Sequence, residues 1–242
     1  MPECGYAHGF PGQRPQRCRR ATPAVKAKDW HAWHDDYDVP DSNLSRRLDV
    51  VQDRIRKALD GCPAGPLRVL SICAGQGRDL LGVLATHPRR RDVVARLVEL
   101  DERNAAAARA AAEAAGLRGI EVIVGDASVT DHYAGMVPAH LVLACGLFGN
   151  ITDEDIERTA GYVSRMCKAD GLVVWTRHRR PPDIVPQLCR WFGQYGFELD
   201  FLTPPHLTFG VGVHRSTAEP SALEMGHRMF TFVGREYLQR YG

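Results

Sequence analysis

The first periodic stretch of the chain lies at residues 43–61. Its large apolar side chains recur every three or four positions: Leu44, Leu48, Val51, Ile55 and Leu59. Apolar residues at this spacing fall on one face of an α-helix, and most positions between them are charged or polar. The pattern predicts one amphipathic helix that begins near Ser42 or Asn43 and stops at Gly61.

After Gly61, short apolar runs alternate with stretches of helical periodicity. Strands are expected at 67–73, 93–99, 120–124, 139–144 and 171–176, and near 197–202, 207–214 and 228–233. Helices are expected at 77–86, 102–115, 128–135, 152–167 and 182–195. Strands that alternate with helices predict a doubly wound α/β fold, a mostly parallel sheet with helices on both faces. The helix-poor C-terminal end predicts an antiparallel edge, and the first helix an N-terminal helical cap.

The pattern divides the chain into three parts. Residues 1–28 mix Gly, Pro and Arg without periodicity and are expected to form a disordered basic arm, for which a solvated leader is favoured over contact with a polyanion. Residues 29–62 are expected to form the helical cap or lid. Residues 63–242 are expected to form a Rossmann-like domain, because no linker divides them.

Composition excludes several classes of protein. The net charge is only +2 over 242 residues, which favours a small molecule over nucleic acid as the partner. No apolar run is long enough to cross a membrane, and no apolar signal core follows the N-terminal charges, so we expect a cytoplasmic protein without a membrane partner. The seven cysteines include no Cys-x-x-Cys pair, so neither a disulfide framework nor a bound metal is expected. The oligomeric state stays open.

The stretch RVLSICAGQGRDLL, residues 68–81, turns from a strand into a helix through Gly75 and Gly77. A helix N-terminus exposes unpaired N–H groups and the positive end of the helix dipole, so this turn can receive a nucleotide-like ligand. A dinucleotide fingerprint needs a third glycine where Leu80 stands, which weakens NAD as the ligand. A phosphate loop of the Walker type needs a Lys that is missing here.

Two acids at the ends of the next strands narrow the choice of ligand. Glu99 ends the second strand, where a carboxylate can accept hydrogen bonds from both hydroxyls of a ribose. Asp101 competes for that role, but its position suits the cap of the following helix. Asp126 follows the third strand and can accept a hydrogen bond from the exocyclic amine of adenine.

With the glycine turn and both acids in place, residues 66–235 resemble the class I S-adenosylmethionine-dependent methyltransferases. The resemblance implies that the AGQG turn holds the methionine part of the cofactor, that Glu99 binds the ribose and that the GDA segment at 125–127 flanks the adenine. The segment VLACGLFGNI, residues 142–151, would run beneath the sulfonium and face the acceptor. The expected cofactor-binding residues are Ser71, Ala74, Gly75, Gln76, Gly77, Glu99, Leu100, Asp126, Ala127, Cys145 and Gly146. The family commonly has an acid in the first strand, and Ser71 and Cys73 stand in that region here.

Candidate catalytic residues lie on either side of this core. The segment WHAWHDDY, residues 30–37, is either a lid over the site or a strap packed on the sheet edge. As a lid, it would use His34 and Tyr37 to order the acceptor and exclude water. His178, at the carboxyl end of the fifth strand, is the candidate general base. The neighbouring arginines at 177, 179 and 180 form either a solvated turn or an anchor for substrate anions.

Methyl transfer from a sulfonium needs little beyond an acceptor held in line, so the acceptor is harder to predict than the cofactor. The resemblance implies one exclusion: ACGLFG stands after the fourth strand in place of the Asn/Asp-Pro-Pro-aromatic signature that marks transfer to planar amino nitrogens. We therefore predict an S-adenosylmethionine-dependent methyltransferase acting on a small aromatic or heterocyclic molecule. The alternatives are an RNA methyltransferase that uses the basic arm, a nucleotide-binding scaffold without transfer activity and, more weakly, an NAD-dependent reductase.

Overall fold

The computed structural model describes residues 29, 37–219 and 221–234 of the chain. The predicted basic arm at 1–28 lies outside the described residues. So does most of the aromatic segment 30–37, including His34.

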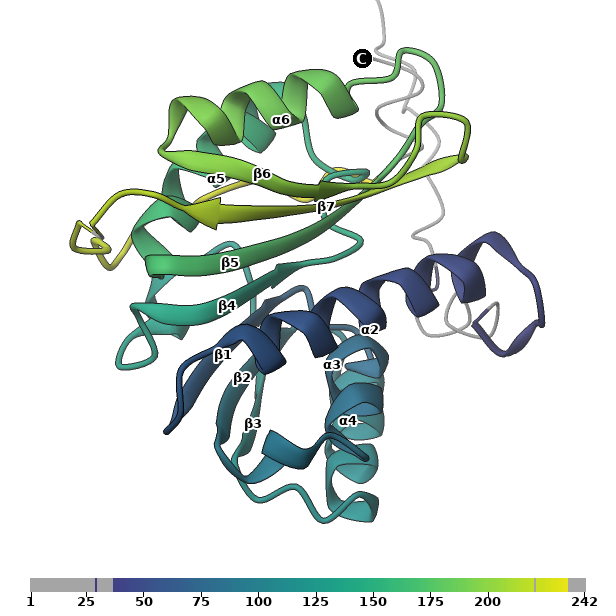
Figure 1. The fold of residues 1–242 in the computed structure, drawn as a ribbon, viewed down its shortest axis with the longest axis vertical. Coiled ribbons are helices and arrows are strands. Elements are labelled where there is room, and N and C mark those ends of the chain that lie inside the picture. The colour runs from purple at the N-terminus through teal and green to yellow at the C-terminus, as the bar shows by residue number, and fades with distance from the viewer. Residues whose placement is uncertain (1–28, 30–36, 220, 235–242) are drawn as a thin grey trace, which may run out of the picture.

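One seven-stranded sheet forms the centre of the structure (Figure 1). Its strands in chain order are β1 (Leu67–Ile72), β2 (Val93–Glu99), β3 (Ile120–Val124), β4 (Ala139–Ala144), β5 (Cys167–His178), β6 (Phe197–Leu202) and β7 (Phe209–Ser216). Their spatial order is β3-β2-β1-β4-β5-β7-β6, in which β1 to β5 are parallel and β7 is antiparallel to both β5 and β6. The predicted parallel sheet with an antiparallel edge is confirmed.

The predicted strand at 228–233 is wrong. Within the described residues this segment makes one isolated bridge, between Val129 and Arg228, and no ladder. Its N–H groups bond instead to loops: Met229 donates to the carbonyl of Ser128, and Val233 to that of Asn150. Its apolar pattern arises because Met229 and Phe230 are buried against the domain, and side-chain burial does not require a sheet. We call residues 223–234 the C-terminal strap.

Helices cover both faces of the sheet (Figure 1). The helices α2 (Asn43–Gly61), α3 (Arg78–Leu84) and α4 (Glu102–Ala114) lie on one face, and α5 (Asp153–Met166) and α6 (Val185–Gln194) on the other. The structure also has two short 3-10 helices, η2 (Pro88–Arg91) and η3 (Thr130–Tyr133). Among the described helices, none has both the length and the apolar character that crossing a membrane needs.

The first helix, α2, starts where the sequence predicts. Ser42 caps it by accepting a hydrogen bond from the backbone N–H of Ser45 at 3.0 Å. Its apolar face, including Val51 and Ile55, packs into the core that α3 shares with the sheet. Helix α2 is therefore part of the helical layer on this face of the sheet. Its N-terminal half forms a wall of the cavity described below.

An aromatic cluster fills the core between β5, β7 and α6. The Trp175 ring stacks on Phe192 with 6.3 Å between centroids, and His214 stacks on Phe192 at 4.9 Å. The indole Nε1 of Trp175 donates to Nδ1 of His214 at 3.0 Å. Burial lowers the pKa of His214 to about 4, so the ring is neutral at neutral pH and can accept this bond.

Acidification is therefore expected to destabilise the protein. An unfolded His binds a proton near pH 6.5, whereas folded His214 resists it down to about pH 4, so the unfolded state gains protons first and the free energy of unfolding falls as pH drops through this window. His214→Asn keeps an acceptor near the indole and removes the titration. Urea unfolding at about pH 7 and about pH 5 should show a smaller acid-induced loss for His214→Asn than for the parent chain, and equal losses would count against this role.

Candidate active site

The turn between β1 and α3 has the backbone geometry that its glycines predict. Three of its residues have positive φ angles: Cys73 at 54°, Gly75 at 56° and Gly77 at 66°. A side chain at Gly77 would place its Cβ 2.8 Å from Leu97 Cδ2 and 2.9 Å from Leu81 Cδ1. Gly77 therefore allows α3 to pack closely against β2. In the same turn, the backbone N–H of Gly75 points toward the Glu99 carboxylate and donates a hydrogen bond to it.

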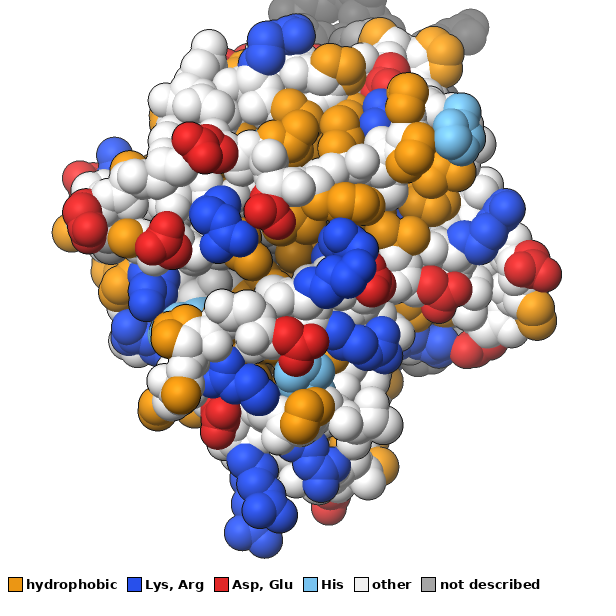
Figure 2. Space-filling view, viewed as in Figure 1, with side chains coloured by type: hydrophobic (Ala, Val, Ile, Leu, Met, Phe, Trp, Pro, Cys, Tyr) orange, Lys and Arg blue, Asp and Glu red, His pale blue; other side chains and the backbone are white. Residues whose placement is uncertain are grey.

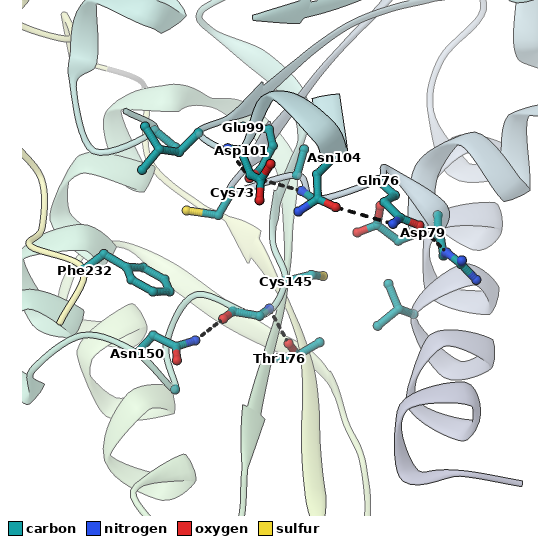
Figure 3. Close-up of a pocket in the computed structure, with 18 of the residues that line it drawn as sticks. Cys73, Gln76, Asp79, Glu99, Asp101, Asn104, Cys145, Asn150, Thr176 and Phe232 are labelled. Carbon is teal, nitrogen blue, oxygen red and sulfur yellow. Dashed lines mark hydrogen bonds between the residues drawn. The ribbon is translucent and has the colours of Figure 1, made fainter. Parts of the chain in front are cut away.

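A cavity of about 490 Å³ opens at the carboxyl ends of the strands, beside this turn. Figure 3 shows its side chains pointing inward from the β1–α3 turn, from α4, from the loop after β4 and from the strap. The lining residues are Tyr37, Arg47, Leu48, Val51, Cys73, Ala74, Gly75, Gln76, Arg78, Asp79, Glu99, Leu100, Asp101, Asn104, Asp126, Ala127, Cys145, Gly146, Gly149, Asn150, Thr176, Arg177, His178, Phe230 and Phe232. Figure 2 shows hydrophobic side chains gathered in a hollow of one face of the molecule, with charged side chains around it.

Two of the predicted cofactor-binding residues do not line the cavity. Ser71 is buried within β1, between β2 and β4, at 2% exposure. Cys73 lines the cavity in its place. Gly77 acts in helix packing, as described above. The other nine, from Ala74 to Gly146, all lie in the wall of this one cavity.

Glu99 joins the two loops that form the upper wall of the cavity in Figure 3. Its Oε2 accepts the N–H of Gly75 at 2.7 Å and its Oε1 accepts the N–H of Asp101 at 2.9 Å. Burial raises the pKa of Glu99, and the two backbone donors oppose that rise. Each oxygen keeps a second lone pair, so the carboxylate can still accept from a ribose hydroxyl.

Asn104, in the first turn of α4, is a site residue that the sequence did not reveal. Its Oδ1 accepts from Nε2 of Gln76 at 3.4 Å, whereas its Nδ2 is buried and has no partner among the described residues. An unpaired buried donor is costly, and a ligand oxygen in the cavity would relieve that cost. Its position three residues after the helix cap Asp101 was the available signal.

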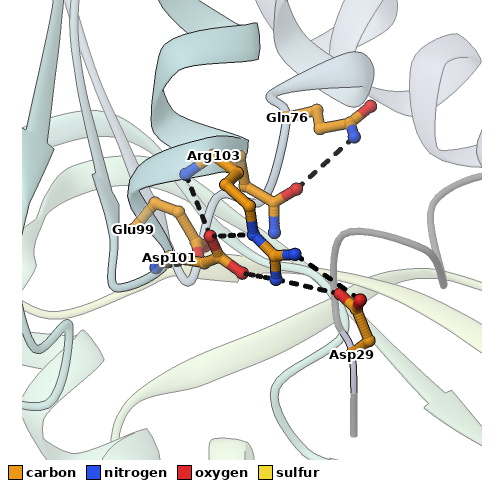
Figure 4. Close-up of polar contacts among 6 residues, drawn as sticks. Asp29, Gln76, Glu99, Asp101 and Arg103 are labelled. Atoms are coloured by element: carbon orange, nitrogen blue, oxygen red, sulfur yellow. Dashed lines mark hydrogen bonds and ion pairs between the residues drawn. The ribbon is translucent and has the colours of Figure 1, made fainter.

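Asp101 has a structural role at the rim of the cavity. It caps α4 by accepting from the N–H of Arg103 at 2.9 Å. Figure 4 shows the Arg103 guanidinium between Asp101 and Asp29, at 2.7 and 2.9 Å. The preference for Asp101 as helix cap is confirmed, and this ion pair also connects Asp29, in the segment before α2, to the cavity rim.

Asp126 lies at the third strand end, as expected, and already has partners. Burial opposes its ionisation, but hydrogen bonds from Ser128 and Arg228 outweigh burial and hold its pKa below the usual value. Arg228 of the strap donates to Asp126 at 2.6 Å. Asp126 therefore links the predicted adenine pocket to the strap.

The segment after β4 forms the floor in Figure 3. The N–H of Gly146 donates to Oγ1 of Thr176 at 2.8 Å, and Nδ2 of Asn150 donates to the carbonyl of Gly146 at 2.7 Å. The Cys145 thiol is partly buried beside Asp79, and desolvation raises the pKa of both groups. A thiol with a raised pKa is a wall residue and not a nucleophile.

Tyr37 closes one side of the cavity. Its hydroxyl accepts a hydrogen bond from Nη2 of Arg47 on α2 at 3.3 Å, and burial raises its pKa. This contact joins Tyr37 to the helix that forms one wall of the cavity, and a lid and a packing strap would both make it. His34 lies outside the described residues, so its role in ordering the acceptor stays a prediction.

His178 reaches the cavity from the end of β5. Burial and the adjacent arginines lower its pKa to about 4, so the ring is neutral near pH 7. Its Nδ1 accepts from the N–H of Arg180 at 3.3 Å, which assigns the ring proton to Nε2. In this tautomer His178 offers a donor, and this geometry does not support the general-base role predicted from the sequence.

The C-terminal strap supplies an aromatic wall. Phe230 and Phe232 line the cavity. Asp155 holds the segment between them by accepting the N–H of Thr231 at 2.6 Å, and Arg158 Nε donates to the carbonyl of Met229 at 2.8 Å. Sequence reasoning missed these residues because it placed the segment in the sheet.

Comparison with known proteins identifies a family. A family model described as "Putative methyltransferase" matches residues 44–188, which is more than half of the chain. No curated protein matches by sequence. Within the described part of the chain, no group of three or more His, Cys, Asp and Glu side chains is arranged to hold a metal ion.

Solved structures share the fold at low sequence identity. An O-methyltransferase family protein from Burkholderia thailandensis aligns with a TM-score of 0.61 at 14% identity, over 78% of this chain and 60% of that one, so this chain spans under two thirds of its length. Magnesium protoporphyrin IX methyltransferase from Synechocystis PCC 6803, with bound SAM, has a TM-score of 0.58 at 11% identity over 79% and 92%. The 1,6-didemethyltoxoflavin-N1-methyltransferase of B. thailandensis, with bound 1,6-didemethyltoxoflavin and S-adenosylhomocysteine, has a TM-score of 0.58 at 15% identity over 78% and 84%.

Proposed function

The chain belongs to the methyltransferase family whose model it matches, and from this premise we propose that it transfers the methyl group of S-adenosylmethionine to a small aromatic or heterocyclic molecule. One observation carries the proposal: a single cavity has the glycine turn and Glu99 on one side and an aromatic, basic wall on the other. Its volume of about 490 Å³ lies in the range of small-molecule sites. Cofactor and acceptor would share this cavity, as in-line transfer requires.

The β1–β3 side of the cavity suits the cofactor. Glu99 and the unpaired Nδ2 of Asn104 would bind the ribose hydroxyls, one as acceptor and the other as donor. Leu100, Asp126 and Ala127 would flank the adenine. Asp79 lines the cavity where Ser71 does not, so we assign it the ammonium group of the methionine part, whose charge would favour the ionised carboxylate.

When bound, the cofactor supplies a methyl group that its sulfonium already activates. The protein then needs mainly to hold the acceptor in line and exclude water. Phe230 and Phe232 would pack on a planar acceptor, and Tyr37 would close the cavity over it. Because His178 offers a donor, the acceptor would lose its proton to water and not to a strong base of the chain.

A mass-spectrometric screen tests this function. The chain is incubated with S-adenosylmethionine and a panel of aromatic and heteroaromatic alcohols, amines and acids, and each product is examined for the gain of one methyl group. Gain of a methyl on any member supports the proposal. Cofactor binding without transfer to small molecules or RNA would instead support the scaffold alternative, and transfer to RNA alone would support the basic-arm alternative.

Tyr37→Phe is expected to lower turnover more than stability. The ring would keep its packing, while the hydroxyl contact with Arg47 is lost; that bond is worth about 1 kcal/mol, or roughly fivefold in kcat/KM. A rate and a melting curve on the same variant provide the test. If the melting temperature falls and turnover per folded molecule persists, Tyr37 only packs the segment 30–37 against the domain and does not act as part of a lid.

A further inference from the structure

Arg177, at the end of β5, is a buried charge that forms no ion pair with the described residues. Its exposure is 8%, and its side chain makes one hydrogen bond within this part of the chain, from Nη1 to the carbonyl of Phe148. Its Nε is buried and has no partner in the described part of the chain, where no carboxylate lies within ion-pair distance of the guanidinium. Asp153 and Asp183 act on it only through longer-range attraction. A buried guanidinium stays protonated and is costly unless an anion compensates it.

Arg179, a second buried arginine two residues further on, has the ion pair that Arg177 lacks among the described residues. The Arg179 side chain is 5% exposed, and its Nε also lacks a partner. Unlike Arg177, it forms an ion pair with Asp183 at 2.9 Å and donates to the carbonyl of Thr203 at 3.1 Å. Arg179 does not line the cavity, whereas Arg177 does. The uncompensated charge is the one that faces the ligand space.

Gly149 leaves the space in front of Arg177 open. A Cβ at this position would lie 3.6 Å from Nη1 of Arg177 and 3.5 Å from Cδ2 of His178. The Arg177 and His178 side chains therefore lie next to each other in the cavity wall, beside Gly149. The His178 tautomer described above adds an N–H donor to the donors of the guanidinium, and the pair presents donors only.

The location of this pair separates it from the proposed cofactor half. Arg177 and His178 end β5, which lies two strands from β1 and on the opposite side of it from β2 and β3. The aromatic residues Phe230 and Phe232 belong to the same cavity. A planar ring with an acidic substituent matches this combination of aromatic wall and N–H donors.

We propose that the acceptor carries a carboxylate that Arg177 and His178 bind, so that the substrate class is a small aromatic or heteroaromatic acid. This inference rests on the proposed function, because it assigns the acceptor half of the same site. The planar fork of arginine pairs with a carboxylate through two parallel hydrogen bonds, and the Nε2–H of His178 adds a third donor. The neutral amide of the same acid offers one oxygen and brings its own N–H donors against these groups.

Calorimetric binding of matched acid and amide pairs tests this proposal. Salicylate and salicylamide, picolinate and picolinamide, and indole-2-carboxylate with its amide are titrated into the full chain in the presence of S-adenosylhomocysteine. We expect at least one acid to bind about tenfold or more tightly than its amide, as a charge-assisted pair provides. Acids that bind no better than their amides, or no binding by any member, would overturn the proposal.

Variants assign the preference to the residue. Arg177→Gln should reduce the acid preference to below about threefold, and Arg177→Lys, which keeps the charge without the fork, should retain part of it. Arg179→Gln is the matched control, and should lower the melting temperature without changing the preference. An unchanged preference in Arg177→Gln would overturn the assignment even if that variant were less stable.

Binding of S-adenosylhomocysteine alone separates the two proposals. If Arg177→Gln binds it as the parent chain does, the guanidinium serves the acceptor, as proposed. If that variant loses S-adenosylhomocysteine binding while remaining folded, the guanidinium serves the cofactor and this inference is wrong. If the parent chain itself does not bind S-adenosylhomocysteine, the proposed function fails, whatever the acids do.

Discussion

Glu99→Gln is expected to weaken binding of S-adenosylhomocysteine by roughly thirtyfold, about 2 kcal/mol, which is the value of a hydrogen bond to a buried charged group. Both oxygens of Glu99 accept backbone N–H groups, from Gly75 and from Asp101. An amide keeps one oxygen and turns its NH₂ toward the other donor, so one of the two loops must move. The proposed ribose contact is lost with the carboxylate. Calorimetric titration of the variant measures the effect.

Asp101→Asn provides the matched control. Asparagine caps a helix as well as aspartate does, and the exposed ion pair with Arg103 that is lost contributes little. Cofactor affinity should therefore change by less than about threefold. If Asp101→Asn lost much cofactor affinity and Glu99→Gln lost little, the ribose-binding role would be assigned to Asp101 instead of Glu99.

Gly212→Ala is expected to destabilise the fold more than any other glycine-to-alanine change in the sheet. Gly212 in β7 pairs with Trp175 in β5, and its added Cβ would lie 2.2 Å from Cζ2 of the indole. The ring cannot move away, because it stacks on Phe192 and donates to His214. Overpacking of this kind costs about 3 kcal/mol. Urea unfolding measures the loss, and because Thr176 and Arg177 follow Trp175 directly, acceptor turnover should fall as well.

Gly193→Ala is the comparison variant. Gly193 is exposed in α6, where a Cβ meets nothing within 4 Å. Alanine is a better helix former than glycine, so this change should stabilise the protein by up to about 1 kcal/mol. If Gly212→Ala proved as well tolerated as Gly193→Ala, the aromatic cluster would be looser than its stacking indicates.

Local periodicity predicted the sheet because the chain alternates strands and helices with clear turn signals. Helix α2, the five parallel strands and the cap at Asp101 follow from short-range pattern alone. Residues 228–233 show the limit. Buried Met229 and Phe230 have the alternation of a strand, but only the fold decides whether their N–H groups meet a neighbouring strand or, as here, the loops at Ser128 and Asn150.

The candidate site was predictable where a strand end determines it. Glu99, Asp126 and the glycine turn follow strands of the parallel sheet, so their meeting at one edge follows from topology. The strap and Asn104 needed the tertiary structure, because their roles depend on which groups lie opposite. For Arg177 the sequence left a solvated turn and an anion anchor open. Both Arg177 and Arg179 have buried side chains, and what separates them is that Arg179 pairs with Asp183, whereas Arg177 lines the cavity and has no ion pair among the described residues.

Calorimetric titration of the full chain with S-adenosylhomocysteine, and separately with NAD, tests the central claim most directly. The cavity has a turn without the third glycine, Glu99 as the proposed ribose ligand, and an Asn104 Nδ2 that lacks a partner among the described residues. It predicts one S-adenosylhomocysteine per chain and no measurable NAD binding. Tight NAD binding without S-adenosylhomocysteine binding would contradict the account.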